Sequence, residues 1–115
     1  MSRNQKGGQK GEQAAADYLS AKGYDIVARN VRTPYDEIDL IAQKAGYTIF
    51  LEVKAHTSRT LGPPEIAVTP RKQQHMLSCA EHCAQQNEID HWQIHVIAVE
   101  DENSKLEIVR FENAI

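Results

Sequence analysis

The stretch Glu37–Lys54, which reads EIDLIAQKAGYTIFLEVK, decides how the rest of the sequence is interpreted. Two apolar runs rich in β-branched residues flank a polar connector, Gln43–Gly46, and this pattern predicts a β-hairpin. Because side chains alternate between the two faces of a strand, Ile38, Leu40 and Ala42 should share one face of the first strand. Acids interrupt both apolar runs where a purely structural strand would have none. The hairpin is therefore expected to hold a chemical site as well as part of the core.

Three charged side chains of the hairpin point to metal-assisted chemistry. Glu52 and Lys54 are two residues apart and so lie on one face, about 7 Å from each other along the strand. If the apolar faces of the hairpin coincide, Asp39 lies beside them. Two carboxylates suit Mg²⁺, which takes one or two of them together with waters and substrate phosphate oxygens. Such a cation lowers the pKa of a bound water, and a nearby amine stabilises developing charge. The alternative is an ordinary ion pair on a solvated strand face.

The composition is that of a soluble globular protein, and 115 residues are enough for one domain, 1–115, with a modest core. Residues 1–75 hold 11 Lys/Arg and 8 Asp/Glu, whereas residues 76–115 hold 2 and 8. We therefore expect nucleic acid to meet the earlier part of the chain. Neither a bilayer-spanning apolar run nor a signal peptide is found, which predicts a cytoplasmic protein. Residues 1–7 are expected to form a mobile tail.

The segment before the hairpin is predicted to form one helix and one strand. The helix should span Gln9–Lys22 and end at Gly23. Glu12 falls at the border of its buried face, where it could either belong to a site or simply favour the helix dipole. The strand should span Tyr24–Val31, and its Arg29-Asn30 pair could contact a phosphate, with a turn as the alternative role for Asn30. The apolar stripe of the helix comprises Ala15, Tyr18 and Leu19.

After the hairpin, the pattern predicts a second helix and two strands. The helix should begin at Pro70, with Thr69 as its N-cap, and extend to Gln86. The strands should span Trp92–Val99 and Lys105–Phe111. The helix is expected to bury Met76, Ala80, Cys83 and Ala84. Cys79 and Cys83 are expected to be reduced and structural; a zinc site with His75 is the alternative, which would need a fourth ligand.

Three basic residues are candidates for binding nucleic acid. Lys72 lies near the start of the second helix, where a cation opposes the helix dipole, so a phosphate contact would explain its position. Arg71 precedes it, and Arg59 belongs to a long polar loop, His56–Val68, which could close over a substrate. Solvated surface charges are the alternative for all three.

Five motifs carry a family resemblance: Gly8–Glu12, Arg29-Asn30, Glu37–Ile41, Phe50–Lys54 and Lys72. Together they resemble the YraN-like family of PD-(D/E)xK (restriction-endonuclease-like) proteins, which is related to archaeal Holliday junction resolvases. The resemblance covers Gly8–Val99. The chain differs from the family pattern at Asp36, where the family usually has Gly, and at Gln93–His95, where it tends to have Arg-Phe-Asp.

This resemblance implies an α/β fold with an αβββαβ core, in which helices flank a mixed central sheet. It implies Mg²⁺ (or Mn²⁺) as the cofactor, bound by Asp39 and Glu52, and a catalytic set of Glu12, Asp39, Glu52 and Lys54. In that set Lys54 would position or activate water, and Glu12 would orient the metal or a second water. The implied function is endonuclease-like hydrolysis of phosphodiester bonds in DNA, with branched DNA and a homodimer suggested by analogy. The alternative is a non-catalytic nucleic-acid-binding or structural module that keeps the nuclease fold.

Overall fold

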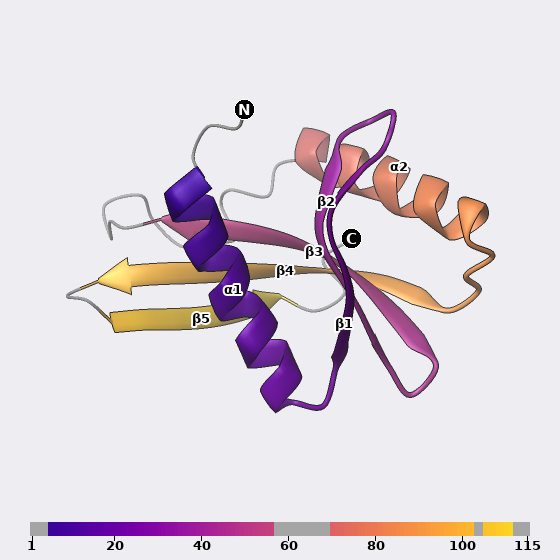
Figure 1. Ribbon diagram of the computed structural model, residues 1–115. Helices are drawn as coiled ribbons and strands as arrows, with labels where there is room; N and C mark the ends of the chain where they lie inside the picture. Colours follow the sequence, from indigo (N-terminus) through magenta and orange to yellow (C-terminus); the bar gives the residue numbers. More distant parts are fainter. Residues whose placement is uncertain (1–4, 57–69, 103–104, 112–115) are drawn as a thin grey trace.

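The computed structural model describes residues 5–56, 70–102 and 105–111, and within these ranges the chain forms an α/β fold around one sheet (Figure 1). All five strands join in the order β1-β2-β3-β4-β5. Only β3 and β4 run parallel, and α2 lies between them in the sequence. The predicted class, a mixed sheet flanked by helices with αβββαβ order, is confirmed. The elements are α1 (Gln5–Ala21), β1 (Asp25–Arg32), β2 (Glu37–Lys44), β3 (Tyr47–His56), α2 (Pro70–Gln86), β4 (Trp92–Glu102) and β5 (Lys105–Phe111).

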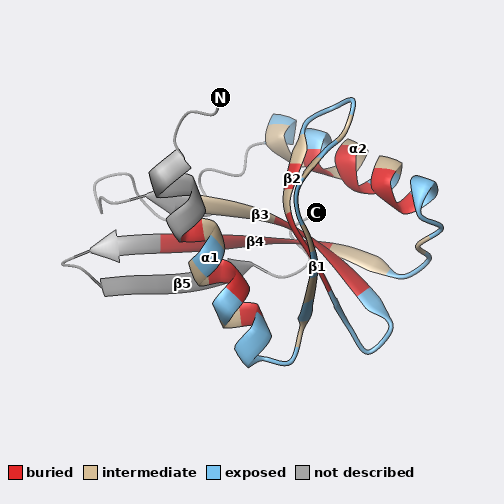
Figure 2. Ribbon diagram, viewed as in Figure 1, coloured by how far each residue is buried: buried red, intermediate tan, exposed pale blue. Residues whose placement is uncertain are grey.

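The two helices pack on opposite faces of the sheet, which gives three layers with a core on each side of the central strands (Figure 2). On the α1 side, Ala15, Ala16 and Leu19 pack against Leu40 and Leu51, among others. Tyr18, predicted in this stripe, is only partly buried. On the α2 side, the buried helix residues are Met76, Cys79, Ala80, Cys83 and Ala84, which include all four that were predicted.

The β2–β3 hairpin closes through a turn of two residues, Ala45 and Gly46, whose φ angles are 53° and 85°. Positive φ at both positions is the geometry of a type I′ turn, which matches the twist of the strands it joins. The predicted connector Gln43–Gly46 was too long, because Gln43 and Lys44 still pair with β3. The polar character of these two residues reflects an exposed strand end, not a loop.

β2 changes face at Asp39. Ile38 belongs to the core on the α2 side, whereas Leu40, two residues later, belongs to the core on the α1 side. The prediction that the two share a face is therefore wrong for Ile38. The register places Asp39 opposite Asn30, which has a φ of 52°, and left-handed backbone interrupts regular pleating. Pairing between β2 and β3 also ends at the Leu40–Leu51 pair, so the two strands part just where Asp39 begins.

The remaining boundaries differ from prediction mainly at the chain's polar segments. α1 begins at Gln5, so residues 5–7 are helical and not part of a tail, while residues 1–4 lie outside the described ranges. The polar run before Gly11 has no apolar repeat from which helix could be inferred. At the other end Gly23 has a φ of 92° and terminates α1 as predicted. β4 continues three residues past Val99 by pairing with β5, whose bounds match the prediction, as do those of α2.

Thr69, the predicted N-cap, lies outside the described ranges. Neither α1 nor α2 is long and apolar enough to cross a membrane.

Cys79 and Cys83 are free thiols that are 2% and 6% exposed within the α2-side core. Replacing both by Ala should lower the free energy of unfolding by about 1–3 kcal/mol, because each substitution removes a buried atom and leaves a small void. Urea unfolding would measure the loss. Metal binding at the carboxylates described below should persist, because neither thiol is among the proposed ligands. Stoichiometric zinc in the wild-type protein, lost in the double variant, would contradict a purely structural role.

Candidate functional site

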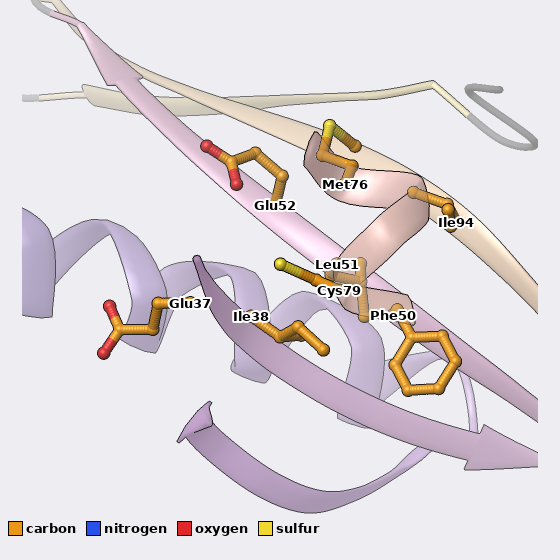
Figure 3. A pocket seen from close by; sticks show the side chains of 8 residues that line it. All are labelled: Glu37, Ile38, Phe50, Leu51, Glu52, Met76, Cys79 and Ile94. Carbon is orange, nitrogen blue, oxygen red and sulfur yellow. The ribbon is translucent and has the colours of Figure 1, made fainter. Parts of the chain in front are cut away.

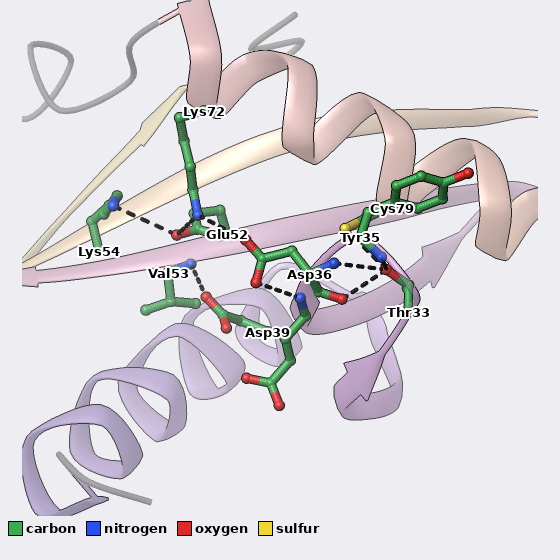
Figure 4. A network of polar contacts seen from close by, with 10 residues as sticks. Thr33, Tyr35, Asp36, Asp39, Glu52, Val53, Lys54, Lys72 and Cys79 are labelled. Atoms are coloured by element: carbon green, nitrogen blue, oxygen red, sulfur yellow. Dashed lines mark hydrogen bonds and ion pairs between the residues drawn. The ribbon is translucent and has the colours of Figure 1, made fainter.

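The candidate site lies in the fork where β2 and β3 separate. Immediately beyond the last β2–β3 pair, the Val53 backbone N–H of β3 donates to Asp39 Oδ2 at 2.7 Å (Figure 4). A side-chain carboxylate thus takes the place of a strand carbonyl in the ladder. This bond fixes Asp39 between the two strands, next to Glu52, as the sequence predicted from the hairpin alone.

Glu52 and Lys54 follow Phe50 at two-residue intervals along β3, and so lie on the face of the sheet that α2 covers. Lys54 Nζ is 3.6 Å from Glu52 Oε2, and the two side chains are 30% and 13% exposed. Lys72, from the first turn of α2, reaches the same oxygen at 3.3 Å. Two ammonium groups therefore converge on one oxygen of Glu52 (Figure 4).

Asp39 has the most altered acidity of the site. Burial, followed by the negative charge of Glu52, raises its pKa to about 7, although the Val53 hydrogen bond acts in the opposite direction. The charges of Glu12 and Glu37 add to the increase. Near neutral pH the Asp39 carboxyl is therefore close to half-protonated when no cation is bound. A cation beside it would favour the ionised form, because it would offset both the burial and the neighbouring acids.

Glu12 belongs to α1, and its negative charge acts on Asp39. With its amide nitrogen oriented toward α1, Asn30 donates to both carboxylate oxygens of Glu12, at 3.1 and 3.3 Å. Burial raises the pKa of Glu12, the Asn30 bond opposes this rise, and the charge of Glu37 adds to it. Arg29 donates to Gln13 Oε1 at 2.9 Å, so both members of the Arg29-Asn30 pair hold α1 in this structure. The positioning role of Asn30 was not among those predicted for it.

A shallow, mainly apolar recess lies beside the fork, between α2 and strands β2, β3 and β4 (Figure 3). The carboxylates of Glu37 and Glu52 stand at its rim, and apolar side chains form its floor (Figure 3). An apolar floor strengthens the electrostatic interactions of the acids above it, since less water screens them. Its lining comprises Glu37, Ile38, Phe50, Leu51, Glu52, Met76, Cys79 and Ile94.

The donor set fits a hard cation better than a zinc ion. Among the described residues, no three His, Cys, Asp or Glu side chains gather as a metal-binding group. The pair that remains at the fork is Asp39 and Glu52, and Mg²⁺ needs only one or two carboxylates because water and substrate supply its other ligands. A closed zinc site would need four protein ligands.

The three basic residues predicted to contact nucleic acid differ in their surroundings. Arg71 is exposed on α2. Lys72 instead turns inward, where its ammonium lies 3.3 Å from Glu52 and 3.8 Å from Asp36. Burial acts to lower the pKa of Lys72, but the charges of Glu52, Asp36 and Asp39 outweigh it, and the net shift is upward. Arg59 lies outside the described residues.

Gln93 and His95 do not join the fork. They pair in register with Ile49 and Leu51, before the strands separate, and they bond to each other at 2.9 Å. His95 is only 2% exposed. The difference from the family pattern at these residues therefore does not alter the placement of Asp39, Glu52 and Lys54 at the fork.

Comparison with known proteins gives a family for the matched segment. The model of a family described as uncharacterised protein family UPF0102 matches residues 11–99, a range that contains Glu12, Asp39, Glu52, Lys54 and Lys72. A UPF0102 protein of Symbiobacterium thermophilum is 52% identical over 73 residues, which cover 64% of this chain and 62% of that protein. One of Dehalococcoides mccartyi is 39% identical over 85 residues, covering 74% and 70%. One of Thermodesulfovibrio yellowstonii is 44% identical over 73 residues, covering 64% and 65%, so the chain spans less than two thirds of two of these relatives.

Proposed function

This chain belongs to the uncharacterised protein family UPF0102, and we propose from its site that it is an endonuclease-like protein that hydrolyses phosphodiester bonds in DNA with Mg²⁺ or Mn²⁺. The observation that carries the proposal is the meeting of Asp39, Glu52 and Lys54 at the fork between β2 and β3. An acid whose pKa is raised by burial and by a second acid is a costly arrangement beside an amine, and such arrangements are typical of functional sites.

Each residue has a role that its position supports. Asp39 and Glu52 would hold the cation; when bound, the cation polarises the phosphoryl group and lowers the pKa of a bound water. Lys54 would stabilise the charge of the attacking hydroxide or of the transition state. Glu12, fixed by Asn30 on the α1 side, would orient a water. The order of helices and strands also agrees with the restriction-endonuclease-like core that the sequence motifs imply.

DNA is the proposed partner because positive charge concentrates in the first 75 residues, and Arg71 remains an exposed candidate contact for a phosphate. Branched DNA as substrate and a homodimer as the acting form stay predictions from analogy.

One observation favours the alternative, a nucleic-acid-binding module that lacks catalysis. Lys54 and Lys72 together place two positive charges on Glu52 Oε2, so a proposed metal ligand is already neutralised by the protein's own side chains. A protein that kept this pairing when bound to nucleic acid would have little affinity for a divalent cation.

A cleavage screen separates the two proposals. We expect cutting in Mg²⁺ or Mn²⁺ of at least one member of a set of labelled duplex, single-stranded and branched DNA and RNA, and no cutting in EDTA. The Glu52→Gln variant, purified in parallel, should be inactive, which excludes a contaminating nuclease. Salt-dependent binding without cleavage of any substrate would favour the binding module instead.

A further inference from the structure

We propose that Lys72 is a movable counter-ion of the site: its ammonium holds Glu52 in the metal-free protein, competes there with a divalent cation, and moves to Asp36 when the cation binds. This inference rests on the proposed divalent site at Asp39 and Glu52. It assigns Lys72 a positioning role in place of the phosphate contact expected from the sequence.

The first support is where the lysine lies. It is in the first turn of α2, where the helix dipole disfavours a cation, and its side chain is only 26% exposed. Glu52 at 3.3 Å and Asp36 at 3.8 Å compensate for both costs. One of the acids that keep the ammonium charged, Glu52, is therefore an acid that a divalent cation would also use.

The second support is the repulsion between two cations that bind Glu52 at the same time. A hard divalent cation binds a carboxylate oxygen at about 2.1 Å, and an ammonium remaining on the same carboxylate would repel it strongly across so short a distance. The lysine ammonium can move away from Glu52, since it lies at the end of a flexible four-carbon chain.

The third support is a second acid within reach. Asp36 is 45% exposed, and its Oδ1 accepts the Glu37 backbone N–H at 2.8 Å, which holds the side chain beside the site. Its other oxygen, Oδ2, already contacts Lys72. Lys72 can therefore leave Glu52 without losing an anionic partner. Lys54 differs, because its only ion pair among the described residues is with Glu52.

The turn that carries Asp36 is itself fastened to α2. Thr33 Oγ1 lies 3.2 Å from Cys79 Sγ, and the Thr33 hydroxyl also bonds the Asp36 carbonyl at 2.7 Å (Figure 4). One contact between this turn and α2, together with a hydrogen bond inside the turn, thus helps to hold Asp36 near Lys72.

The test is calorimetric titration of the full chain with Mn²⁺ alone, without nucleic acid. We expect Lys72→Met to bind Mn²⁺ about fivefold more tightly than wild type, the size of one partly screened charge pair. Arg71→Met is the matched control: it removes the same charge one residue earlier, from an exposed position, and should change the affinity much less. Lys72→Arg should remain near wild type.

A second pair of variants tests the role of Asp36. Asp36→Asn should weaken Mn²⁺ binding in the wild-type background, because Lys72 would then lose the second acid that it contacts in this structure. The same substitution in Lys72→Met should have a clearly smaller effect. Additive effects would overturn the transfer to Asp36.

Equal Mn²⁺ affinity in wild type and Lys72→Met, including no binding by either, would overturn the competition itself. In metal-free protein, Lys72→Met and Glu52→Gln should show coupled effects on urea stability, and independent effects would likewise count against the counter-ion. These readouts do not depend on cleavage. Failure of the hydrolase proposal is judged separately, by the cleavage screen.

Discussion

Replacing Asp39 by Asn is expected to stabilise the metal-free protein at pH 8 and to remove its response to Mn²⁺. Asn keeps the shape of the side chain, and its carbonyl oxygen can still accept the Val53 N–H that fixes Asp39 at the fork. What it loses is a negative charge that is partly buried and faces other acids. The Asp39 carboxylate thus lowers the stability of the metal-free protein. A bound cation that needs this negative charge is the simplest explanation for its presence.

The direction of the stability effect follows from the pKa of Asp39, which is about 7 in the folded protein against an ordinary value of 3.8. The folded state therefore holds this proton more tightly than the unfolded state does. The contribution of Asp39 to wild-type stability should fall as the pH rises from about 4 to about 7, and should then level off. The Asn side chain does not titrate, so its advantage should be absent near pH 4 and complete above pH 7. We expect that advantage to be a few kcal/mol, since each unit of pKa shift corresponds to about 1.4 kcal/mol.

Thermal unfolding at pH 4 and pH 8, with and without Mn²⁺, would measure both effects. Mn²⁺ should raise the wild-type melting temperature, since a ligand of the folded state alone stabilises it by about 2.7 kcal/mol at one hundred times its dissociation constant. The Asp39→Asn protein should melt at the same temperature with or without the ion. Glu81→Gln, which removes an exposed acid of α2, is the control and should behave like wild type in every condition. An undiminished Mn²⁺ response in Asp39→Asn would show that Asp39 is not a ligand.

The part of the site that could be predicted from sequence is the part that depends on local spacing. The two-residue interval fixes Glu52 and Lys54 on one face of β3, whatever the rest of the chain does. Asp39 could be placed beside them on the assumption that the apolar faces of the two strands coincide. These inferences needed only the period of a strand.

The other members of the site depend on contacts between distant segments, which periodicity does not encode. Lys72 is 20 positions from Glu52 in the sequence, and its inward direction follows from how α2 packs on the sheet. The positive φ of Asn30 turns its side chain to Glu12, whereas the sequence offered only its position near a strand end. The face change of β2 was likewise missed, because strict alternation is assumed when Ile38 is assigned to the face of Leu40.

Replacing Lys54 by Ala is expected to slow cleavage by about 10²-fold or more, the cost of removing a group that stabilises charge in the transition state. The variant should still bind Mn²⁺. Its affinity should stay equal or increase, because an ammonium 3.6 Å from Glu52 repels a cation at the same carboxylate. The fold should tolerate the change, since the Lys54 side chain is 30% exposed and lies near the end of the described part of β3.

Single-turnover cleavage at saturating Mn²⁺, beside a Mn²⁺ titration of the same preparations, separates the two roles within the hairpin. Asp39→Asn should lose cleavage through loss of the cation, whereas Lys54→Ala should lose it with the cation bound. Lys22→Ala removes an equal charge at the far end of α1, where Lys22 lies over the Tyr18 ring, and should cut at the wild-type rate. Full activity in Lys54→Ala would rule out its catalytic role. If Lys54→Ala instead fails to bind Mn²⁺, the lysine supports the carboxylates and does not act on the reacting phosphate, because loss of a like charge cannot by itself weaken cation binding.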